Sequence, residues 1–370
     1  MLLPRQICYN HADTFGHPRT KNQGIAVIQK GKKATINDVA HLAGVSKKTV
    51  SRVINKSPKV SDKTREKVEQ IMLKLNYTPD PQARGLASKK SFLLGLVYDN
   101  PNASYVADIQ QGVLDQCRTE GYELVVHPCD HRSANLVGEL SRFIDRLKLD
   151  GVVLLPPLSE NTQLTDMLAK SGCQYARIAS VPFNDAPHLV QSDDEIGMNQ
   201  IADHLVELGH RDIGFIHGPK DYQSAQQRYK GFKTALSRHG ITLTNQHVAW
   251  GAYTYESGTA CAESLLATQP RPTAIVASND EMALGVLVTA ANRGVAVPEE
   301  LSIVGYDDEP HASKIYPSLT TVNQNVQKMG QLAATKLVAL CRGDTNIATQ
   351  TQYLVTPDLI TRQSTARAPF

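Results

Sequence analysis

The most constraining feature of this 370-residue sequence is a repeated alternation of short apolar runs and amphipathic stretches after residue 90. Each apolar run has the length of a strand that is buried on both faces of a sheet. These runs lie at 92–98, 122–127, 151–155, 212–216, 273–277 and 301–305, and helical stretches lie between them at 109–120, 196–208, 228–239 and 282–293. Strands that alternate with helices specify parallel, doubly wound sheets, and about 280 residues favour two such lobes over one.

Polar side chains follow three of the predicted strands, where ligands of doubly wound sheets bind. They are Asp99 and Asn100, Asn279 and Asp280, and Asp307 and Asp308. Arg228 is expected to open the helix at 228–239. Carboxylates, an amide and a guanidinium can hold sugar hydroxyls through bidentate hydrogen bonds. Structural alternatives stay open: Asp99, Asn279 and Asp307 also suit helix caps, and Arg228 suits a surface ion pair.

The net charge of +3 conceals an uneven distribution along the chain. Residues 34–90 hold 12 Lys and Arg against 5 Asp and Glu, and residues 1–33 hold 6 against 1. Residues 91–370 hold 21 against 30. A basic segment joined to an acidic body suggests a module that binds a polyanion, although a solvated charged face would have the same composition.

The basic segment has the pattern of three short helices. Thr35 and Asp38 have the spacing of a capping box before an apolar face, and Gly44 suits a sharp turn. Ser46 is a natural N-cap for a second helix at 47–54, and Ser61 for a third. A helix, a tight glycine turn and a second helix form a helix-turn-helix unit.

The second helix leaves a polar face that suits the major groove of DNA. Lys47, Lys48 and Arg52 can donate to guanine, and Ser51 and Asn55 can bind phosphates or adenine. A generic three-helix packing unit is the alternative.

Two segments, TINDVAHLAGVSKKTVSRVIN and VSDKTREKVEQIMLKLNYTPDPQARGLA, closely resemble the DNA-binding head of the LacI/GalR family of bacterial repressors. The resemblance implies that Lys47, Lys48 and Arg52 read base edges. It also implies further DNA contacts from Thr35, Ser46, Thr49, Ser51, Asn55, Tyr77 and Arg84. Residues 34–78 would form the head, and a hinge segment would follow at 79–90.

Leu86 falls where this family wedges a leucine into the minor groove and kinks the duplex. Gly85 precedes it, and glycine costs roughly 1 kcal/mol relative to alanine within a helix. We therefore predict that the hinge is disordered without DNA and folds when two copies pair on the operator. A leucine in a small core is the alternative role.

The body resembles the effector domain of the same family, which shares the type I fold of periplasmic sugar-binding proteins. The matching segments are GLVYDNPN, LDGVVLLPP, GHRDIGFIHGP, QQRYKGF, TAIVASNDEMALG and LSIVGYDDEP. The resemblance implies that Arg228 and Asp307 contact the effector, and that Tyr98, Asp99 and Asn279 line its site. Trp250, the single tryptophan, could stack on a sugar face or serve in packing.

Two lobes joined by three crossovers follow from this resemblance. The first lobe is expected at about 91–190 and 324–350, and the second at about 191–323 and 351–366. The chain carries no leucine heptads after the predicted last strand at 353–355, so we expect a homodimer rather than a tetramer built on a coiled coil. Residues 1–33 match nothing in the family; we interpret them as a disordered basic arm or as an artefact of the chosen start site, and a role in DNA contact is a further alternative.

Enzyme motifs are missing from the sequence. It contains no GxSxG, GxxxxGK[ST] or HExxH motif and no GxGxxG after a strand, and its histidines lack metal spacing. We expect no catalytic residues, no cofactor and no metal. A Rossmann-like enzyme with an accessory DNA-binding head remains a weaker alternative, because fold alone does not decide function.

The sequence also predicts a cytoplasmic location. No apolar stretch approaches the roughly 18 residues of a membrane helix, and Pro4 and Arg5 interrupt any signal-peptide core. Six cysteines without CxxC spacing are typical of reduced thiols. A free solute-binding protein is excluded by the missing signal peptide together with the basic head.

Together these observations predict a repressor of carbohydrate-utilisation genes, released from a palindromic double-stranded operator by a sugar or sugar derivative. The alternative within the same class is a regulator that needs a corepressor and responds to a non-sugar molecule such as a nucleobase or nucleoside.

Overall fold

The computed structural model describes residues 34–54, 57, 59–77, 90–181, 183, 185–351 and 353–369. Contacts divide the chain into two compact units, Met1–Ala83 and Arg84–Phe370, which we call the head and the body. The predicted arm at 1–33, Asn55, and the hinge with Arg84 and Leu86 lie outside the described residues.

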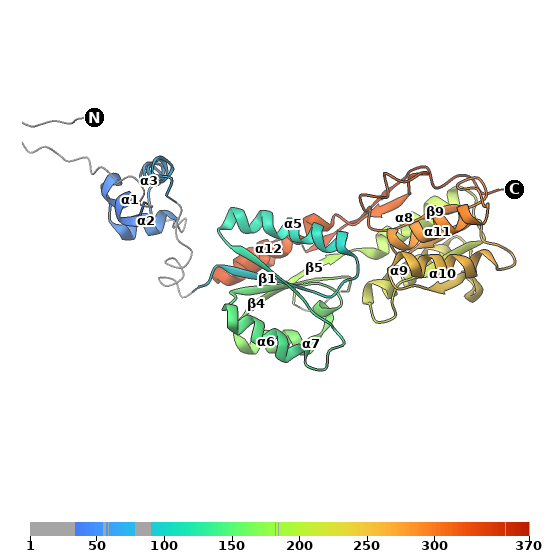
Figure 1. The fold of residues 1–370 in the computed structure, drawn as a ribbon, viewed down its shortest axis with the longest axis horizontal. Coiled ribbons are helices and arrows are strands. Elements are labelled where there is room, and N and C mark those ends of the chain that lie inside the picture. Colours follow the sequence, from blue (N-terminus) through green and yellow to red (C-terminus); the bar gives the residue numbers. More distant parts are fainter. Residues whose placement is uncertain are drawn as a thin grey trace, which may run out of the picture. The chain divides into compact units, whose positions relative to one another are not determined.

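The head contains the three predicted helices, α1 (Ile36–Ala43), α2 (Lys47–Ile54) and α3 (Asp62–Lys74) (Figure 1). The Asp38 carboxylate accepts the Thr35 amide at 2.8 Å, which is the return bond of the capping box, and it also accepts the Thr35 hydroxyl at 2.7 Å. Gly44 ends α1 with a φ of 63°, a left-handed conformation that favours glycine. Buried valines and alanines from the three helices form the small core. The helix-turn-helix prediction is therefore confirmed.

The first lobe of the body is built on a six-stranded parallel sheet in the order β11-β5-β4-β3-β1-β2. Its strands are β1 (Leu93–Tyr98), β2 (Glu123–Pro128), β3 (Gly151–Leu154), β4 (Gln174–Ala179), β5 (Leu189–Ser192) and β11 (Leu354–Val355). Helices α5 (Ala103–Glu120) and α12 (Val326–Arg342) cover one face, and α6 (Leu136–Leu147) and α7 (Thr162–Ser171) cover the other (Figure 1). The short α13 (Thr345–Gln350) packs against α12.

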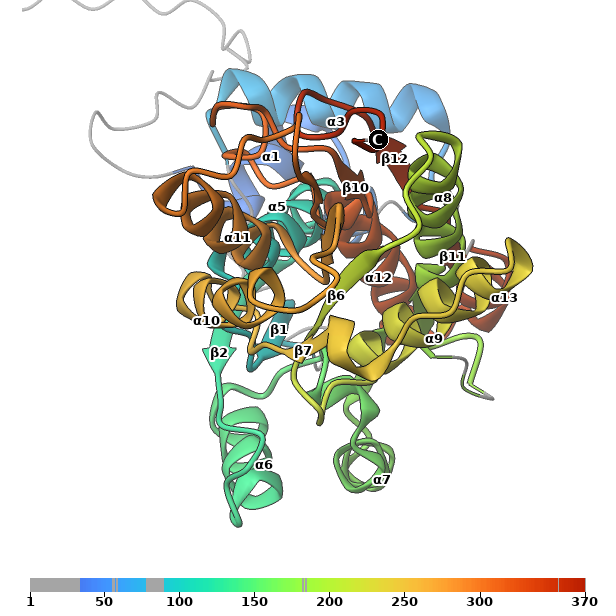
Figure 2. The ribbon, with the colours of Figure 1, turned by 90° about the vertical axis from the view of Figure 1, so that its right-hand side faces the viewer.

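The second lobe repeats this plan on a four-stranded parallel sheet in the order β7-β6-β8-β9. Its strands are β6 (Ile213–His217), β7 (Val248–Trp250), β8 (Ala274–Ala277) and β9 (Ser302–Val304). Figure 2 shows α8 (Asp194–Glu207) and α9 (Gln223–Arg238) on one side of this sheet, and α10 (Tyr255–Leu266) and α11 (Asp280–Asn292) on the other. The antiparallel pair β10 (Thr321–Asn323) and β12 (Asp358–Ile360) completes the lobe. The predicted doubly wound parallel sheets are confirmed.

The chain passes between the lobes after β5, after β10 and after β11. The predicted lobe boundary at residue 351 is wrong, because Leu354 and Val355 pair with Gln191 and Ser192 in the first lobe. This pairing gives the backbone of β5 a partner on what would otherwise be an open sheet edge. The segment at 353–355 is also not the last strand, since β12 follows it. Within the described part of the chain, no helix is long and apolar enough to cross a membrane.

Candidate functional site

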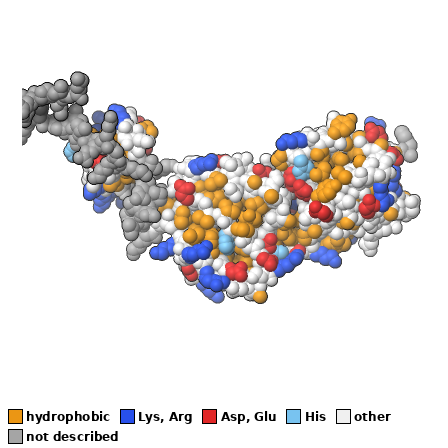
Figure 3. Space-filling view, viewed as in Figure 1, with side chains coloured by type: hydrophobic (Ala, Val, Ile, Leu, Met, Phe, Trp, Pro, Cys, Tyr) orange, Lys and Arg blue, Asp and Glu red, His pale blue; other side chains and the backbone are white. Residues whose placement is uncertain are grey.

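Helix α2 of the head presents the polar residues that the sequence indicated for DNA. Lys47 and Lys48 are exposed, and Ser51 and Arg52 are half-buried beside the core residues Val50 and Val53. The apolar stripe thus fixes α2 to the head and leaves its two lysines exposed. Figure 3 shows Lys and Arg side chains on the surface of the head. Such a helix can enter a major groove.

The other predicted DNA contacts in the head have local structural roles as well. Thr35 belongs to the capping box of α1. The hydroxyl of Ser46 accepts the Thr49 amide at 3.1 Å and lies 2.9 Å from the Thr49 hydroxyl. Tyr77 packs against the head core. In the Ser46–Thr49 pair only one hydroxyl donates to the other, so the second hydroxyl keeps its hydrogen for a phosphate oxygen.

A small, polar cavity lies between the two lobes of the body, close to the carboxyl ends of β4, β5 and β8. Its volume is about 40 Å³, the room of a few water molecules. Arg228, Asn279 and Asp307, three of the predicted effector residues, line it. Other lining residues are Asn102, Tyr105, Tyr222, Ser224, Tyr253 and Gln324.

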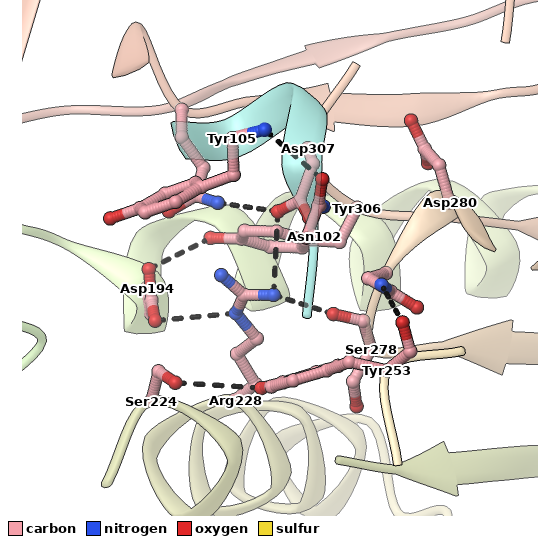
Figure 4. A network of polar contacts seen from close by, with 12 residues as sticks. Asn102, Tyr105, Asp194, Ser224, Arg228, Tyr253, Ser278, Asp280, Tyr306 and Asp307 are labelled. Carbon is pink, nitrogen blue, oxygen red and sulfur yellow. Dashed lines mark hydrogen bonds and ion pairs between the residues drawn. The ribbon is translucent and has the colours of Figure 1, made fainter. Parts of the chain in front are cut away.

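Arg228 is the centre of the polar network in this cavity (Figure 4). Its Nε lies 3.3 Å from Asp194 Oδ2 and its Nη1 lies 3.5 Å from Asp307 Oδ1. Nη1 also donates to the carbonyl oxygen of Ser278 at 2.5 Å. The guanidinium lies over the ring of Tyr306, 3.9 Å from its centroid.

The Arg228 side chain is only 6% exposed, and those of Asp194 and Asp307 are 0% and 8% exposed. Burial alone would lower the pKa of Arg228, but the nearby carboxylates raise it above its ordinary value. The arginine therefore stays charged. The prediction that Arg228 opens a helix or forms a surface ion pair is wrong, because α9 begins at Gln223 and the second turn of this helix faces the cavity.

Asp307 joins the two lobes at this site. Its backbone has a φ of 118°, which is strained for a residue other than glycine, and the loop after β9 holds it there. Asn102 of the first lobe donates to Asp307 Oδ2 at 3.3 Å, and Gln324 donates to Oδ1 at 2.5 Å. Burial raises the pKa of Asp307 to about 7, although Arg228 opposes this shift.

Asn279 shows that a cap and a cavity-lining position can coincide. Its Oδ1 accepts the Met282 amide at 3.0 Å at the start of α11, and its Nδ2 donates to the Tyr253 carbonyl at 3.1 Å. These two bonds fix the orientation of the amide and leave it a second N–H and a second lone pair. Asp280 lies buried behind the loop, where it accepts from Thr321 at 2.6 Å and from the Glu309 amide at 2.8 Å.

Three predicted effector residues are not among those that line the cavity. Tyr98 packs against the core of the first lobe. The Asp99 carboxylate accepts the backbone amide of His131 at 2.7 Å. Trp250 is 48% exposed and stacks on His217, with ring centroids 4.0 Å apart, and the Lys220 ammonium lies over the Trp250 ring, 4.8 Å from its centroid.

Sequence reasoning missed several residues of the cavity. Asn102 lay three positions beyond Asp99 and could have been found from the same strand end. Asp194 and Tyr253 had no such signal, because β5 and β7 were not predicted as strands. Burial raises the pKa of Tyr253 to about 12, so its hydroxyl stays neutral and can donate or accept.

Comparisons with known proteins agree with this architecture. Residues 35–80 match the family model for bacterial regulatory proteins of the lacI family, and residues 202–365 match a periplasmic binding protein-like domain. The chain is 35% identical to the HTH-type transcriptional repressor PurR of Haemophilus influenzae, over 90% of this chain and 98% of that protein. It is 32% identical to the probable HTH-type transcriptional repressor ExuR of Bacillus subtilis, over 83% and 91% of the two chains.

Solved structures of transcriptional regulators also align with most of this chain. The transcriptional regulator CelR in complex with cellobiose aligns with a TM-score of 0.66 and 31% identity, over 90% of this chain and 99% of that one. The lac repressor dimer bound to operator and the anti-inducer ONPF aligns with a TM-score of 0.69 and 29% identity, over 90% and 100%.

Proposed function

The chain belongs to the LacI family of bacterial regulatory proteins and is a DNA-binding transcriptional repressor, and we propose that its effector is a neutral, hydroxyl-rich sugar held between the lobes. The observation behind this proposal is the Arg228 network. The guanidinium of Arg228 faces two acidic side chains, those of Asp194 and Asp307, so its charge is already balanced and an anionic ligand would lack a partner. A neutral hydroxyl can instead donate to the carboxylates and accept from the arginine.

The remaining lining residues suit the same ligand. Tyr105, Tyr222 and Tyr253 offer flat apolar rings with hydroxyls at their ends, which suit the C–H faces and the hydroxyls of a sugar. The amides of Asn102 and Gln324 can donate or accept. The structure of CelR, a transcriptional regulator of similar fold, is that of its complex with cellobiose.

The lobes must separate to admit such a ligand. A cavity of about 40 Å³ does not hold a monosaccharide, and residues of both lobes close it. We infer that the effector binds an open form and that its contacts set the angle between the lobes in the bound form. The effector shifts the equilibrium between the open and closed forms only if its affinities for the two forms differ. The coupling is reciprocal: bound operator weakens effector binding by the same factor by which bound effector weakens operator binding.

At the DNA, we propose a homodimer that places two α2 helices in successive major grooves of a near-palindromic operator. Lys47, Lys48 and Arg52 would read base edges, and paired Leu86 side chains would bend the centre. We place this regulator in the cytoplasm and assign it no enzyme activity and no cofactor.

Operator selection from random DNA tests the proposal. The selection is repeated with neutral mono- and disaccharides, sugar phosphates, sugar acids and nucleobases. We expect a palindromic site whose binding is lost with a neutral sugar. Release by an acid or a phosphate alone would refute the neutral effector, binding that increases with a nucleobase would support the corepressor alternative, and selection of no sequence would refute DNA recognition.

A further inference from the structure

A histidine of the first lobe lies between carboxylates of both lobes. His131 belongs to the loop after β2; its Nδ1 lies 2.5 Å from Asp99 Oδ2 and its Nε2 lies 3.1 Å from Asp221 Oδ2. Asp99 follows β1 in the first lobe, whereas Asp221 belongs to the loop between β6 and α9 in the second. The His131 side chain is only 19% exposed, so water competes weakly for its two nitrogens.

A neutral imidazole has one N–H donor and one lone pair, whereas the imidazolium donates from both nitrogens. Since each nitrogen of His131 faces a carboxylate oxygen, only the protonated ring satisfies both contacts. We propose that His131 is a proton-dependent latch, whose imidazolium holds the two lobes together by bonding Asp221 across the cleft. Loss of the proton turns one of the two contacts into a repulsion between lone pairs.

The neighbouring charges support this assignment. Arg132 Nη2 lies 2.8 Å from Asp221 Oδ2, so Asp99, Asp221, Arg132 and protonated His131 together are neutral. Burial lowers the pKa of His131, but its hydrogen bonds with Asp99 and Asp221 raise it above the ordinary value. Arg132 and His131 lower the pKa of Asp221 to about 2.

Apart from Arg132, no other described group around His131 supplies the positive charge that its proton provides. The carboxylate of Asp130, on the same loop, is exposed and accepts the Arg132 amide at 2.9 Å. From the second lobe, Tyr222 meets the imidazole edge-on at 6.1 Å, and its hydroxyl donates to the Asp99 carbonyl at 3.1 Å. Lys220 lies over Trp250.

The sign of the pH dependence follows from these contacts. Asp99 and His131 belong to the same lobe, so their contact persists when the lobes separate. Only the contact of His131 with Asp221 is present in the closed form and absent in the open form. The closed form gains stability below the pKa of His131 and loses it as the pH rises through this pKa. Arg132 still holds Asp221 at high pH, so closure weakens without being lost. Tyr222, adjacent to Asp221, lines the cavity, so the latch acts on the ligand site whichever ligand binds there.

A direct test is a titration of the full-length protein labelled with ¹³C-histidine, followed by NMR. The His131 signal is identified by its loss in His131→Gln. We expect the His131 pKa to lie above the ordinary value and to fall in Asp221→Asn. The matched control is Asp203→Asn, which removes the partner of His239 at 2.6 Å within the second lobe and should leave His131 unchanged. A His131 pKa that is the same in Asp221→Asn and in wild type would overturn the proposal.

A second measurement reads lobe closure itself. The backbone of Gln223 in the second lobe lies close enough to the Glu160 carboxylate of the first to lower its pKa, so hydrogen exchange of the Gln223 amide should report the fraction of open lobes. Glu160 and Glu309 also lie at the lobe interface, and burial raises the pKa of each to about 7. For this reason, wild type and Asp221→Asn are compared at the same pH.

We expect protection of this amide to fall roughly fivefold in Asp221→Asn at pH 6, the size of a partly exposed ion pair, and by less at pH 9. An equal fall at both pH values would assign the contact to Arg132 alone and refute the role of the His131 proton. No fall at either pH would show that the pair does not hold the lobes together.

Discussion

Replacement of Arg228 by methionine would measure how much the charge of Arg228 in the cavity contributes to the free energy of unfolding. Methionine keeps the apolar stem but removes the charge that faces Asp194 and Asp307, whose side chains are almost fully buried. Removal of one partner from a buried ion pair costs about 3–5 kcal/mol in the free energy of unfolding, because a buried charge stays uncompensated. Asp194 keeps its bonds from Ser192 at 2.8 Å and Tyr306 at 3.2 Å, which favours the lower end of that range.

The loss should grow with pH. Asp307 has a pKa of about 7 in the presence of Arg228, which lowers it. In Arg228→Met this pKa rises, so the folded variant binds a proton that the unfolded chain has released. The free energy of unfolding of the variant then keeps falling above pH 7, where that of the wild type has levelled off, by about 1.4 kcal/mol per pH unit.

Urea unfolding followed by circular dichroism at pH 6 and pH 8 measures both effects. Arg271→Met is a matched control, since Arg271 pairs with Glu300 at 3.4 Å in an exposed position and should cost less than about 1 kcal/mol. We expect folded Arg228→Met to bind operator normally and not to respond to effector. A loss below 1 kcal/mol, or a loss that is equal at both pH values, would refute the electrostatic account of the cavity.

Three further predictions concern DNA and packing. Leu86→Ala should lose specific operator binding in gel-shift titrations and keep most non-specific binding; an equal loss of both would refute the wedge role. Lys47→Ala and Lys48→Ala should each cost roughly 1–3 kcal/mol of discrimination at one guanine of the half-site, and operator selection with each variant checks this. Gly112→Ala should lower the melting temperature, since its Cβ would lie 2.0 Å from the Gln327 carbonyl oxygen where α5 meets α12; an unchanged melting temperature would contradict that close helix contact.

The local elements of this protein follow from the sequence alone. Helix α2 was predicted with the bounds that the structure has, because the N-cap at Ser46 and the spacing of Val50 and Val53 act within one or two turns. The buried strands β1, β3, β6 and β8 were recognisable because each is a continuous apolar run. In each case the interactions that select the helix or strand join residues a few positions apart, and such residues are close in space because they are close in the sequence.

The charge separation between head and body, the helix-turn-helix unit and the doubly wound lobes were thus determined by the sequence. The partners of the functional side chains were decided by the tertiary structure. Arg228 meets Asp194 and Asp307 only because three elements of the second lobe converge, and His131 meets Asp221 only because the two lobes close. Trp250 and Asp99 had suitable chemistry but do not line the cavity. Local patterning selects helices and strands. Which of several distant carboxylates becomes the partner of a given arginine or histidine depends on how the sheets and lobes pack, and no short window of residues contains that information.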